Sequence, residues 1–125
     1  MDAWTPAELD EIETAHELRI ASRREDGTLR PFVVIWMVRV GDEVFVRPAH
    51  GAQTGWHRRA AAAGAGRVEA GSVARDAVFE LTDLGEGDAI DAAYHAKYDA
   101  HYAKQIVDPV VSGESRALTL RVVPA

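Results

Sequence analysis

The sequence predicts a small β-barrel of the α+β class that occupies residues 1–125 as one domain. Short β-branched runs alternate with Gly-containing turns through the middle of the chain. Two other segments carry helical signals, one before the first strand and one before the last. We therefore expect an N-terminal helix, four or five strands with a short inserted helix, a long helix and one closing strand.

The N-terminal helix begins with clear signals. Thr5 can cap it, Pro6 suits the first helical position, and Glu8 completes a Thr-x-x-Glu capping box. Trp4 and Leu9 stand at the two positions of a hydrophobic staple, so we expect Trp4 to be a packing residue. The helix is predicted to run to about Ala15, followed by a half-buried strand over residues 18–21.

The central stretch from residue 23 to residue 56 organises the rest of the chain. The apolar run Phe32–Val38 predicts one long strand buried on both faces. Asp26-Gly27 predicts a turn before this run, and Gly41-Asp42 predicts a hairpin after it. The returning strand ends at Pro48, which cannot donate to the ladder.

The second half of the chain predicts the inserted helix over residues 55–63, a strand pair over 67–70 and 74–81, and a long helix over 88–106. Ile90, Tyr94, Tyr98 and Tyr102 recur every four residues on the long helix, which is typical of a face packed on a sheet. The closing strand is predicted over residues 117–123, where apolar and polar residues alternate.

Composition excludes several kinds of protein. The absence of cysteine excludes disulfides, thiolate nucleophiles and Cys-ligated metals. No apolar run reaches transmembrane length and no secretory signal is visible, so we expect a soluble cytoplasmic protein with no membrane partner. The net charge of −6 argues against nucleic-acid binding. The five histidines include no pair at metal-ligand spacing, and we expect His95 to form a surface ion pair with Asp91 or Asp99.

The acidic chain has a basic middle. Residues 23–75 carry nine arginines against five acids, whereas the flanking segments 1–22 and 76–125 each carry a balance of −5. Guanidinium groups match phosphate and carboxylate geometry, so this asymmetry favours a small anionic ligand. The alternative is that Trp56 belongs to the core and the arginines pair with Glu25, Asp26, Glu69 and Asp76.

The candidate site combines arginines at strand ends, a Gly-containing loop and an indole. Arginine side chains and free backbone N–H groups form good phosphate sites, and an indole offers a face for a planar ring. No serine triad, dinucleotide fingerprint or phosphate loop is present, and we assign no catalytic residue. The candidate binding residues are Arg24, Arg30, Arg47, His50, Gly51, Trp56, Arg58 and Arg59.

Four segments carry a family resemblance over nearly the whole chain, namely residues 17–51, 55–59, 70–80 and 89–98. They resemble the bacterial domain-of-unknown-function family 2255. More distantly, the order of turn, strand, Gly-Asp hairpin, strand, Gly loop and Trp-bearing helix resembles the split β-barrel proteins that bind FMN or a deazaflavin. In the deazaflavin-dependent nitroreductases, a segment similar to residues 21–30 helps to hold the cofactor phosphate, with Gly27 and Arg30 at corresponding places.

This resemblance implies a split barrel with FMN or a deazaflavin as its cofactor. Arg24, Arg30 and Arg47 are then expected to hold the phosphate. The loop around His50 and Gly51 is expected to present backbone N–H groups. Trp56 is expected to contact the ring system of the cofactor, with Arg58 and Arg59 beside it. A homodimer is also implied. Two functions stay open, an oxidoreductase that transfers hydride through its cofactor, or a non-catalytic ligand-binding or interaction domain that has lost it.

Overall fold

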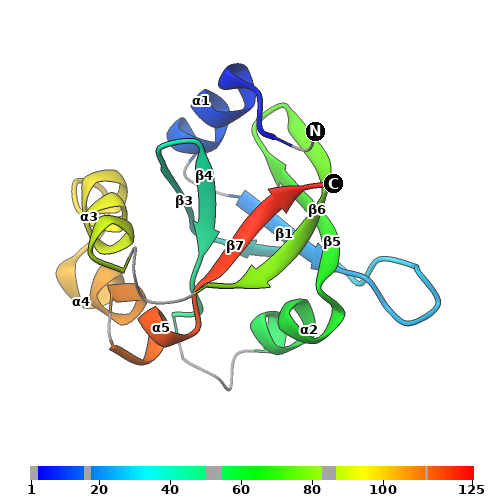
Figure 1. Ribbon diagram of the computed structural model, residues 1–125. Helices are drawn as coiled ribbons and strands as arrows, with labels where there is room; N and C mark the ends of the chain where they lie inside the picture. Colours follow the sequence, from blue (N-terminus) through cyan, green and yellow to red (C-terminus); the bar gives the residue numbers. More distant parts are fainter. Residues whose placement is uncertain (1–2, 16–17, 50–54, 83–86, 112) are drawn as a thin grey trace.

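The computed structural model describes residues 3–15, 18–49, 55–82, 87–111 and 113–125, which form an antiparallel seven-stranded sheet and its helices (Figure 1). The strand order is β2-β1-β5-β6-β7-β4-β3. Only Trp36 separates β2 from β3 along the chain, although they lie at opposite ends of this order, so the sheet curls into a nearly closed barrel. The strands are β1 (Leu18–Ser22), β2 (Val33–Ile35), β3 (Met37–Val40), β4 (Glu43–Val46), β5 (Ala65–Ala70), β6 (Val73–Leu81) and β7 (Leu120–Pro124).

The single long strand predicted over Phe32–Val38 is wrong. The run divides at Trp36 into β2, which pairs with β1, and β3, which pairs with β4. Both are edge strands, and Val34 in β2 is 55% exposed rather than buried. The physical reason is closure of the barrel, because the chain must leave one edge of the sheet and join the other within one residue. A continuous apolar run cannot reveal that change of partner.

The first helix, α1 (Pro6–Thr14), confirms the predicted capping box. The Thr5 hydroxyl accepts a hydrogen bond from the Glu8 amide at 3.1 Å, and the Glu8 carboxylate accepts one from the Thr5 amide at 2.8 Å. Leu9 and Ile12 are buried. Trp4 is a packing residue as predicted, since it is 7% exposed and its indole N–H donates to the Val122 carbonyl at 3.1 Å.

Both predicted turns around the central strands are confirmed. Gly41 connects β3 to β4 with φ at 61°, a conformation that residues with a Cβ rarely adopt. Gly27 has φ at 88°, and the Asp26 carboxylate accepts a hydrogen bond from the Thr28 amide at 3.0 Å. The Gly27 turn and the Gly41 hairpin therefore lie where the sequence predicts them.

The inserted helix α2 (Gly55–Ala63) is confirmed, whereas the long helix is shorter than predicted. The observed helix α3 (Gly87–Tyr98) buries Ile90, Tyr94 and Tyr98, and it ends there. The chain then turns, because Tyr102 packs against Trp36 with ring centroids 4.8 Å apart instead of continuing along the helix axis. Three short helical segments follow before β7, namely α4 (Lys104–Val107), η3 (Asp108–Val111) and α5 (Gly113–Ala117).

Two apolar clusters hold the fold together. The first fills the barrel and includes Leu18, Met37 and Leu120, with α1 and α2 contributing Ile12 and Ala60. The second lies where α3, α4 and η3 pack on β3 and β4, and it is built mainly from Phe45 and the α3 tyrosines. Figure 1 shows these helices grouped beside β3 and β4, apart from α2. The candidate site lies at the boundary between the two clusters.

Candidate functional site

A groove of about 550 Å³ opens between β2, the end of β4, the start of α2 and the α4–η3 segment. Its size lies within the range of small-molecule sites, and apolar side chains dominate its walls. Two indoles, those of Trp36 and Trp56, line the same space, which suits a flat aromatic ligand. The lining residues are Val34, Ile35, Trp36, Arg47, Ala49, Trp56, Gln105, Ile106, Pro109 and Val110.

Trp36 forms a rigid wall of this groove. Its ring stacks on Tyr98 with centroids 4.1 Å apart and planes 8° apart, and it also packs on Tyr102. Trp36 is not among the binding residues predicted from the sequence, because it falls within the apolar run that predicts a buried strand. The tyrosine stripe was the available signal, because aromatic rings pack favourably on one another and two of these tyrosines contact Trp36.

A smaller depression adjoins the groove and shares Trp56 with it. Arg30, at the start of the segment leading to β2, and Arg59, in the first turns of α2, both line this depression. Three of the predicted site residues, Arg30, Trp56 and Arg59, are therefore brought together. The volume of the depression is about 10 Å³, roughly the size of one water molecule, so a larger anion has to rest at its mouth.

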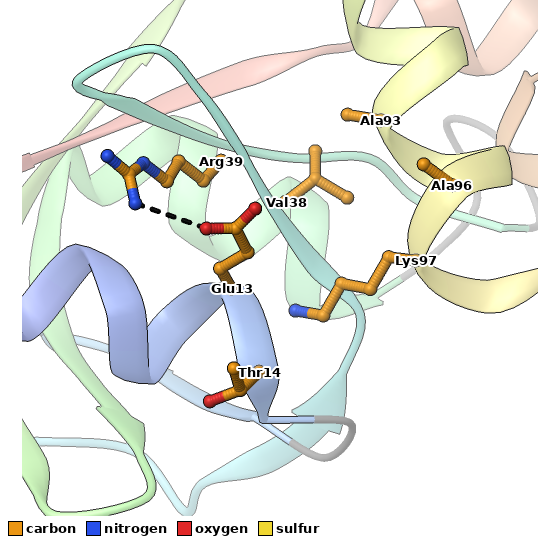
Figure 2. A pocket seen from close by; sticks show the side chains of 7 residues that line it. All are labelled: Glu13, Thr14, Val38, Arg39, Ala93, Ala96 and Lys97. Carbon is orange, nitrogen blue, oxygen red and sulfur yellow. Dashed lines mark hydrogen bonds and ion pairs between the residues drawn. The ribbon is translucent and has the colours of Figure 1, made fainter.

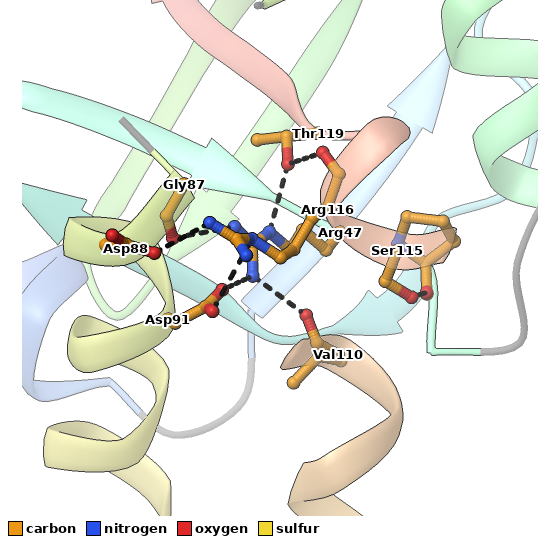
Figure 3. Close-up of polar contacts among 9 residues, drawn as sticks. Arg47, Gly87, Asp88, Asp91, Val110, Ser115, Arg116 and Thr119 are labelled. Atoms are coloured by element: carbon orange, nitrogen blue, oxygen red, sulfur yellow. Dashed lines mark hydrogen bonds and ion pairs between the residues drawn. The ribbon is translucent and has the colours of Figure 1, made fainter. Parts of the chain in front are cut away.

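Arg47 has a different environment from the one expected of a phosphate ligand. Its side chain is 0% exposed, and Figure 3 shows its guanidinium surrounded by protein acceptors. It donates to the Thr119 hydroxyl at 2.9 Å, the Val110 carbonyl at 3.0 Å and the Gly87 carbonyl at 3.2 Å, and it also pairs with Asp91. The geometry favours a structural role, in which Arg47 joins β4 to the helices and to the start of β7.

The remaining predicted residues lie away from the groove or outside the described part of the chain. The Arg24 guanidinium donates to the Leu29 carbonyl at 3.0 Å within the exposed turn. Arg58 is exposed on α2 and does not line the groove. His50 and Gly51 fall in the segment 50–54, which the structure does not describe. The binding roles predicted for these four residues stay predictions.

Most of the basic middle is neutralised by acids that are distant in sequence. Arg39 pairs with Asp10 and Glu13, both at 3.1 Å, and Arg75 pairs with Glu8 at 2.8 Å. Asp76 accepts from Arg23 and Arg67, so it confirms one of the pairings that the sequence suggested. Across residues 3–15, 18–49, 55–82, 87–111 and 113–125, neither Arg30 nor Arg59 has a carboxylate within 4.0 Å.

None of the histidines in the described part of the chain lines the groove. His95 pairs with Asp99 at 2.9 Å, as predicted, whereas Asp91 faces Arg47. His57 is buried, and one ring nitrogen lies 2.7 Å from the Leu118 carbonyl. Within the part of the chain that the structure describes, no group of three or more His, Asp or Glu side chains could hold a metal ion. None of the helices described there is long and apolar enough to cross a membrane.

The fold belongs to the class of split β-barrels found in flavin-binding proteins. A conserved hypothetical protein from Mycobacterium tuberculosis superimposes with a TM-score of 0.57 at 14% identity, covering 99% of this chain and 81% of that one. An FAD and heme binding protein from Mycobacterium smegmatis gives 0.54 at 17% identity, with coverages of 97% and 66%. An F420 reductase gives 0.51 at 16% identity, with coverages of 92% and 89%.

The sequence itself identifies the family. Residues 8–122 match the family described as uncharacterized protein conserved in bacteria (DUF2255), and the chain belongs to it. No curated protein matches the chain. Both the family and the split-barrel fold expected from the resemblance are therefore confirmed.

Proposed function

We propose that this protein binds a flavin or deazaflavin, with the ring system in the groove and the phosphate toward Arg30 and Arg59. One observation carries the proposal: Trp56 is shared between an apolar groove of about 550 Å³ and a depression lined by these two arginines. A phosphorylated flavin has the same order of parts, a flat apolar ring system joined to an anion. Arg59 is exposed, so its side chain can rotate to meet a phosphate at little cost.

The residues present fit such a cofactor in the groove. Trp36 cannot easily turn away, because Tyr98 and Tyr102 hold its ring, and it therefore offers a fixed surface for stacking. Val34, Ile35 and Val110 add apolar side chains to the same space. When bound, the cofactor supplies hydride transfer, while these side chains bind it, orient its ring and lower the local dielectric constant.

A second function is a binding domain of the same fold that lacks a cofactor. Absorbance separates the two proposals directly, since purified protein that retains a flavin or deazaflavin absorbs in the visible region. Protein purified without colour is then titrated with FMN, riboflavin and coenzyme F420 while tryptophan fluorescence is followed. We expect quenching by one phosphorylated cofactor, because Trp36 and Trp56 line the groove.

The arginine pair supplies the sharper test. Charge-assisted hydrogen bonds contribute roughly 1.5 to 3 kcal/mol each, so Arg30→Ala with Arg59→Ala should weaken FMN binding by at least about tenfold. Riboflavin, which lacks phosphate, should bind the double variant and the parent protein almost equally. Arg19→Ala is the matched control, because Arg19 is exposed on β1 and lines neither cavity. Equal loss of FMN and riboflavin affinity in the double variant contradicts a phosphate role.

We also propose a homodimer in which a second copy packs on exposed apolar side chains beside the groove. Val34 on edge strand β2 and Ile106 on α4 are 55% and 51% exposed, and both line the groove. A second copy packed there buries these side chains and closes the groove to water. Sedimentation should then give twice the mass of 13.6 kDa. Val34→Lys should return the monomer, whereas Leu81→Lys, at an exposed residue outside the groove, should not.

We also propose a cytoplasmic location and an oxidoreductase activity, as predicted from the sequence and its family resemblance. Activity is measured by following oxidation of the reduced cofactor in the presence of candidate acceptors. No catalytic residue is assigned, and the substrate is left to that experiment.

A further inference from the structure

A second cavity of about 490 Å³ lies between α1, β3 and α3 and shares no lining residue with the cofactor groove. Figure 2 shows Lys97 reaching from α3 toward α1, with Glu13 and Thr14 nearby. Three small apolar side chains and the side chain of Arg39 form the remaining walls. The lining residues are Glu13, Thr14, Val38, Arg39, Ala93, Ala96 and Lys97.

The amino group of Lys97 is held firmly in place. Its nitrogen donates to the Ile12 carbonyl at 2.7 Å and to the Met37 carbonyl at 2.6 Å. A neutral amine has two N–H groups and one lone pair, so these two carbonyls can take both hydrogens and leave the lone pair available. Burial lowers the pKa of Lys97 from its usual 10.5 to about 8, while the charge of Glu13 acts in the opposite direction. The neutral fraction of the Lys97 amine near pH 7.5 is therefore larger than that of an ordinary lysine.

The chain contains only two lysines, of which Lys97 is largely buried and Lys104 is exposed. Lys104 has a side chain that is 84% exposed and pairs with Asp108 at 2.7 Å. That hydrogen bond and the Asp108 charge raise the pKa of Lys104. Lys104 is therefore a natural internal control for any chemistry that requires a neutral amine.

The charges facing the cavity indicate what kind of ligand it takes. Arg39, on β3, donates to both Asp10 and Glu13 of α1, so its positive charge is already matched by two carboxylates. Once the Lys97 amine is neutral, this group of side chains has a net charge of −1. A carboxylate or phosphate on the ligand would be repelled, whereas an uncharged ligand can occupy the apolar space beside Val38 and Ala96.

We propose that this cavity is a second ligand site, in which the Lys97 amine forms a reversible imine with a small, uncharged aldehyde or ketone. The nitrogen lone pair attacks the carbonyl carbon, a C–N bond forms, and the carbonyl oxygen leaves as water with both amine hydrogens. Glu13 lines the same cavity and can carry these protons between nitrogen and oxygen. The hydrogen bonds to the Ile12 and Met37 carbonyls are given up, because the neutral imine nitrogen carries no hydrogen.

Reductive trapping tests this site. The purified protein is incubated at pH 7.5 with butanal and cyanoborohydride, which converts an imine into a stable secondary amine, and peptides are mapped by mass spectrometry. We expect initial labelling of Lys97 to exceed that of Lys104 by at least about tenfold, because a difference of more than two pKa units outweighs the lower nucleophilicity of the weaker base. Labelling of Lys97 should saturate with butanal concentration, whereas that of Lys104 should rise linearly. Equal labelling of the two lysines overturns the proposal.

Matched variants show whether the cavity itself is used. Ala96→Phe adds a large side chain to the cavity wall, keeps Lys97, and should abolish saturable labelling of Lys97. Circular dichroism checks that this variant is folded. Lys104→Arg should leave labelling of Lys97 unchanged, whereas Lys97→Arg should remove the saturable adduct. Succinate semialdehyde, an anionic aldehyde with the same number of carbons as butanal, should label Lys97 at least about tenfold less than butanal. Unchanged saturable labelling in Ala96→Phe, or equal labelling by succinate semialdehyde, overturns the proposed site.

Discussion

Trp36 and Tyr98 stack with ring centroids 4.1 Å apart and an angle of 8° between their planes. This stack joins the residue between β2 and β3 to the last residue of α3. It therefore connects the two edges of the barrel to the helices that cover it, and it gives the groove a fixed aromatic wall. The Tyr98 hydroxyl adds a polar contact, since it lies 3.2 Å from both the amide nitrogen and the carbonyl oxygen of Met37.

Replacing Tyr98 with Phe should destabilise the protein by about 1 to 3 kcal/mol, because it removes a buried hydroxyl that bonds to the Met37 backbone. The stacked ring is retained, so the change isolates the hydrogen bonds. Tyr102→Phe is the matched control at a half-buried ring of the same cluster, and its expected effect is within about 0.5 kcal/mol. Urea unfolding measures both. Equal effects of the two substitutions contradict a role for the Tyr98 hydroxyl.

Asp91→Asn should destabilise the fold by about 2 to 4 kcal/mol, because it leaves the fully buried Arg47 guanidinium without its carboxylate partner. Asp108→Asn makes the same chemical change beside Lys104, whose side chain is 84% exposed. That control should cost about 0 to 1 kcal/mol. Free energies of unfolding in urea compare the two variants. A small effect at Asp91 shows that Arg47 does not depend on this pair.

Gly66→Ala should destabilise the barrel by at least about 2 kcal/mol, because a Cβ at this position would lie 1.9 Å from the Ala21 carbonyl oxygen and 2.9 Å from the Phe79 ring. The clash involves the backbone of β1, which cannot move without disturbing its pairing with β5. Gly113→Ala is the control, since nothing lies within 4 Å of its added Cβ. Thermal unfolding should separate the two variants clearly.

Stability should rise between pH 8 and pH 9.5 through Lys97. Burial lowers its folded-state pKa to about 8, below the usual 10.5, so the unfolded chain binds more protons in this interval. The free energy of unfolding, relative to a Lys97→Met variant, is therefore expected to be constant below pH 8 and to increase above it. Burial raises the pKa of Tyr94 and Tyr98, so the absolute stability of both proteins falls above about pH 10, and this contribution cancels in the comparison.

Urea unfolding at several pH values from 7 to 9.5 checks this expectation. Lys104→Met should leave the slope unchanged, because the pKa of Lys104 is raised above its usual value and its contribution is constant over this range. If the wild-type protein and Lys97→Met have parallel profiles, the Lys97 amine does not titrate near pH 8.

Local signals were sufficient for much of the fold. The Thr5 and Glu8 capping box, the Gly41 hairpin and the α2 boundaries depend on residues that are close together in the sequence, and all are confirmed. The tyrosine stripe on α3 was also predictable, because a four-residue repeat places side chains on one helix face. Periodicity alone predicted a small barrel of the α+β class, and the family resemblance specified a split barrel.

The candidate site was predicted less completely, because it depends on which distant side chains meet. Arg30 and Arg47 look alike in sequence, as arginines at strand ends within a basic stretch. In the structure Arg47 is surrounded by Asp91, Thr119 and two backbone carbonyls, whereas Arg30 lies beside Trp56. No local pattern distinguishes these outcomes, since the acceptors around Arg47 come from segments 40 or more residues away.

The sequence by itself determined the class of fold, the helix start, the turns and the alternation of strands, because each follows from short-range sterics and side-chain periodicity. Only the tertiary structure decided that the apolar run divides at Trp36, that α3 ends at Tyr98, and that acids from α1 neutralise part of the basic middle. The physical reason is barrel closure. Bringing β2 and β3 to opposite edges of one sheet fixes which distant side chains become neighbours, and those neighbours set the charge and shape of both cavities.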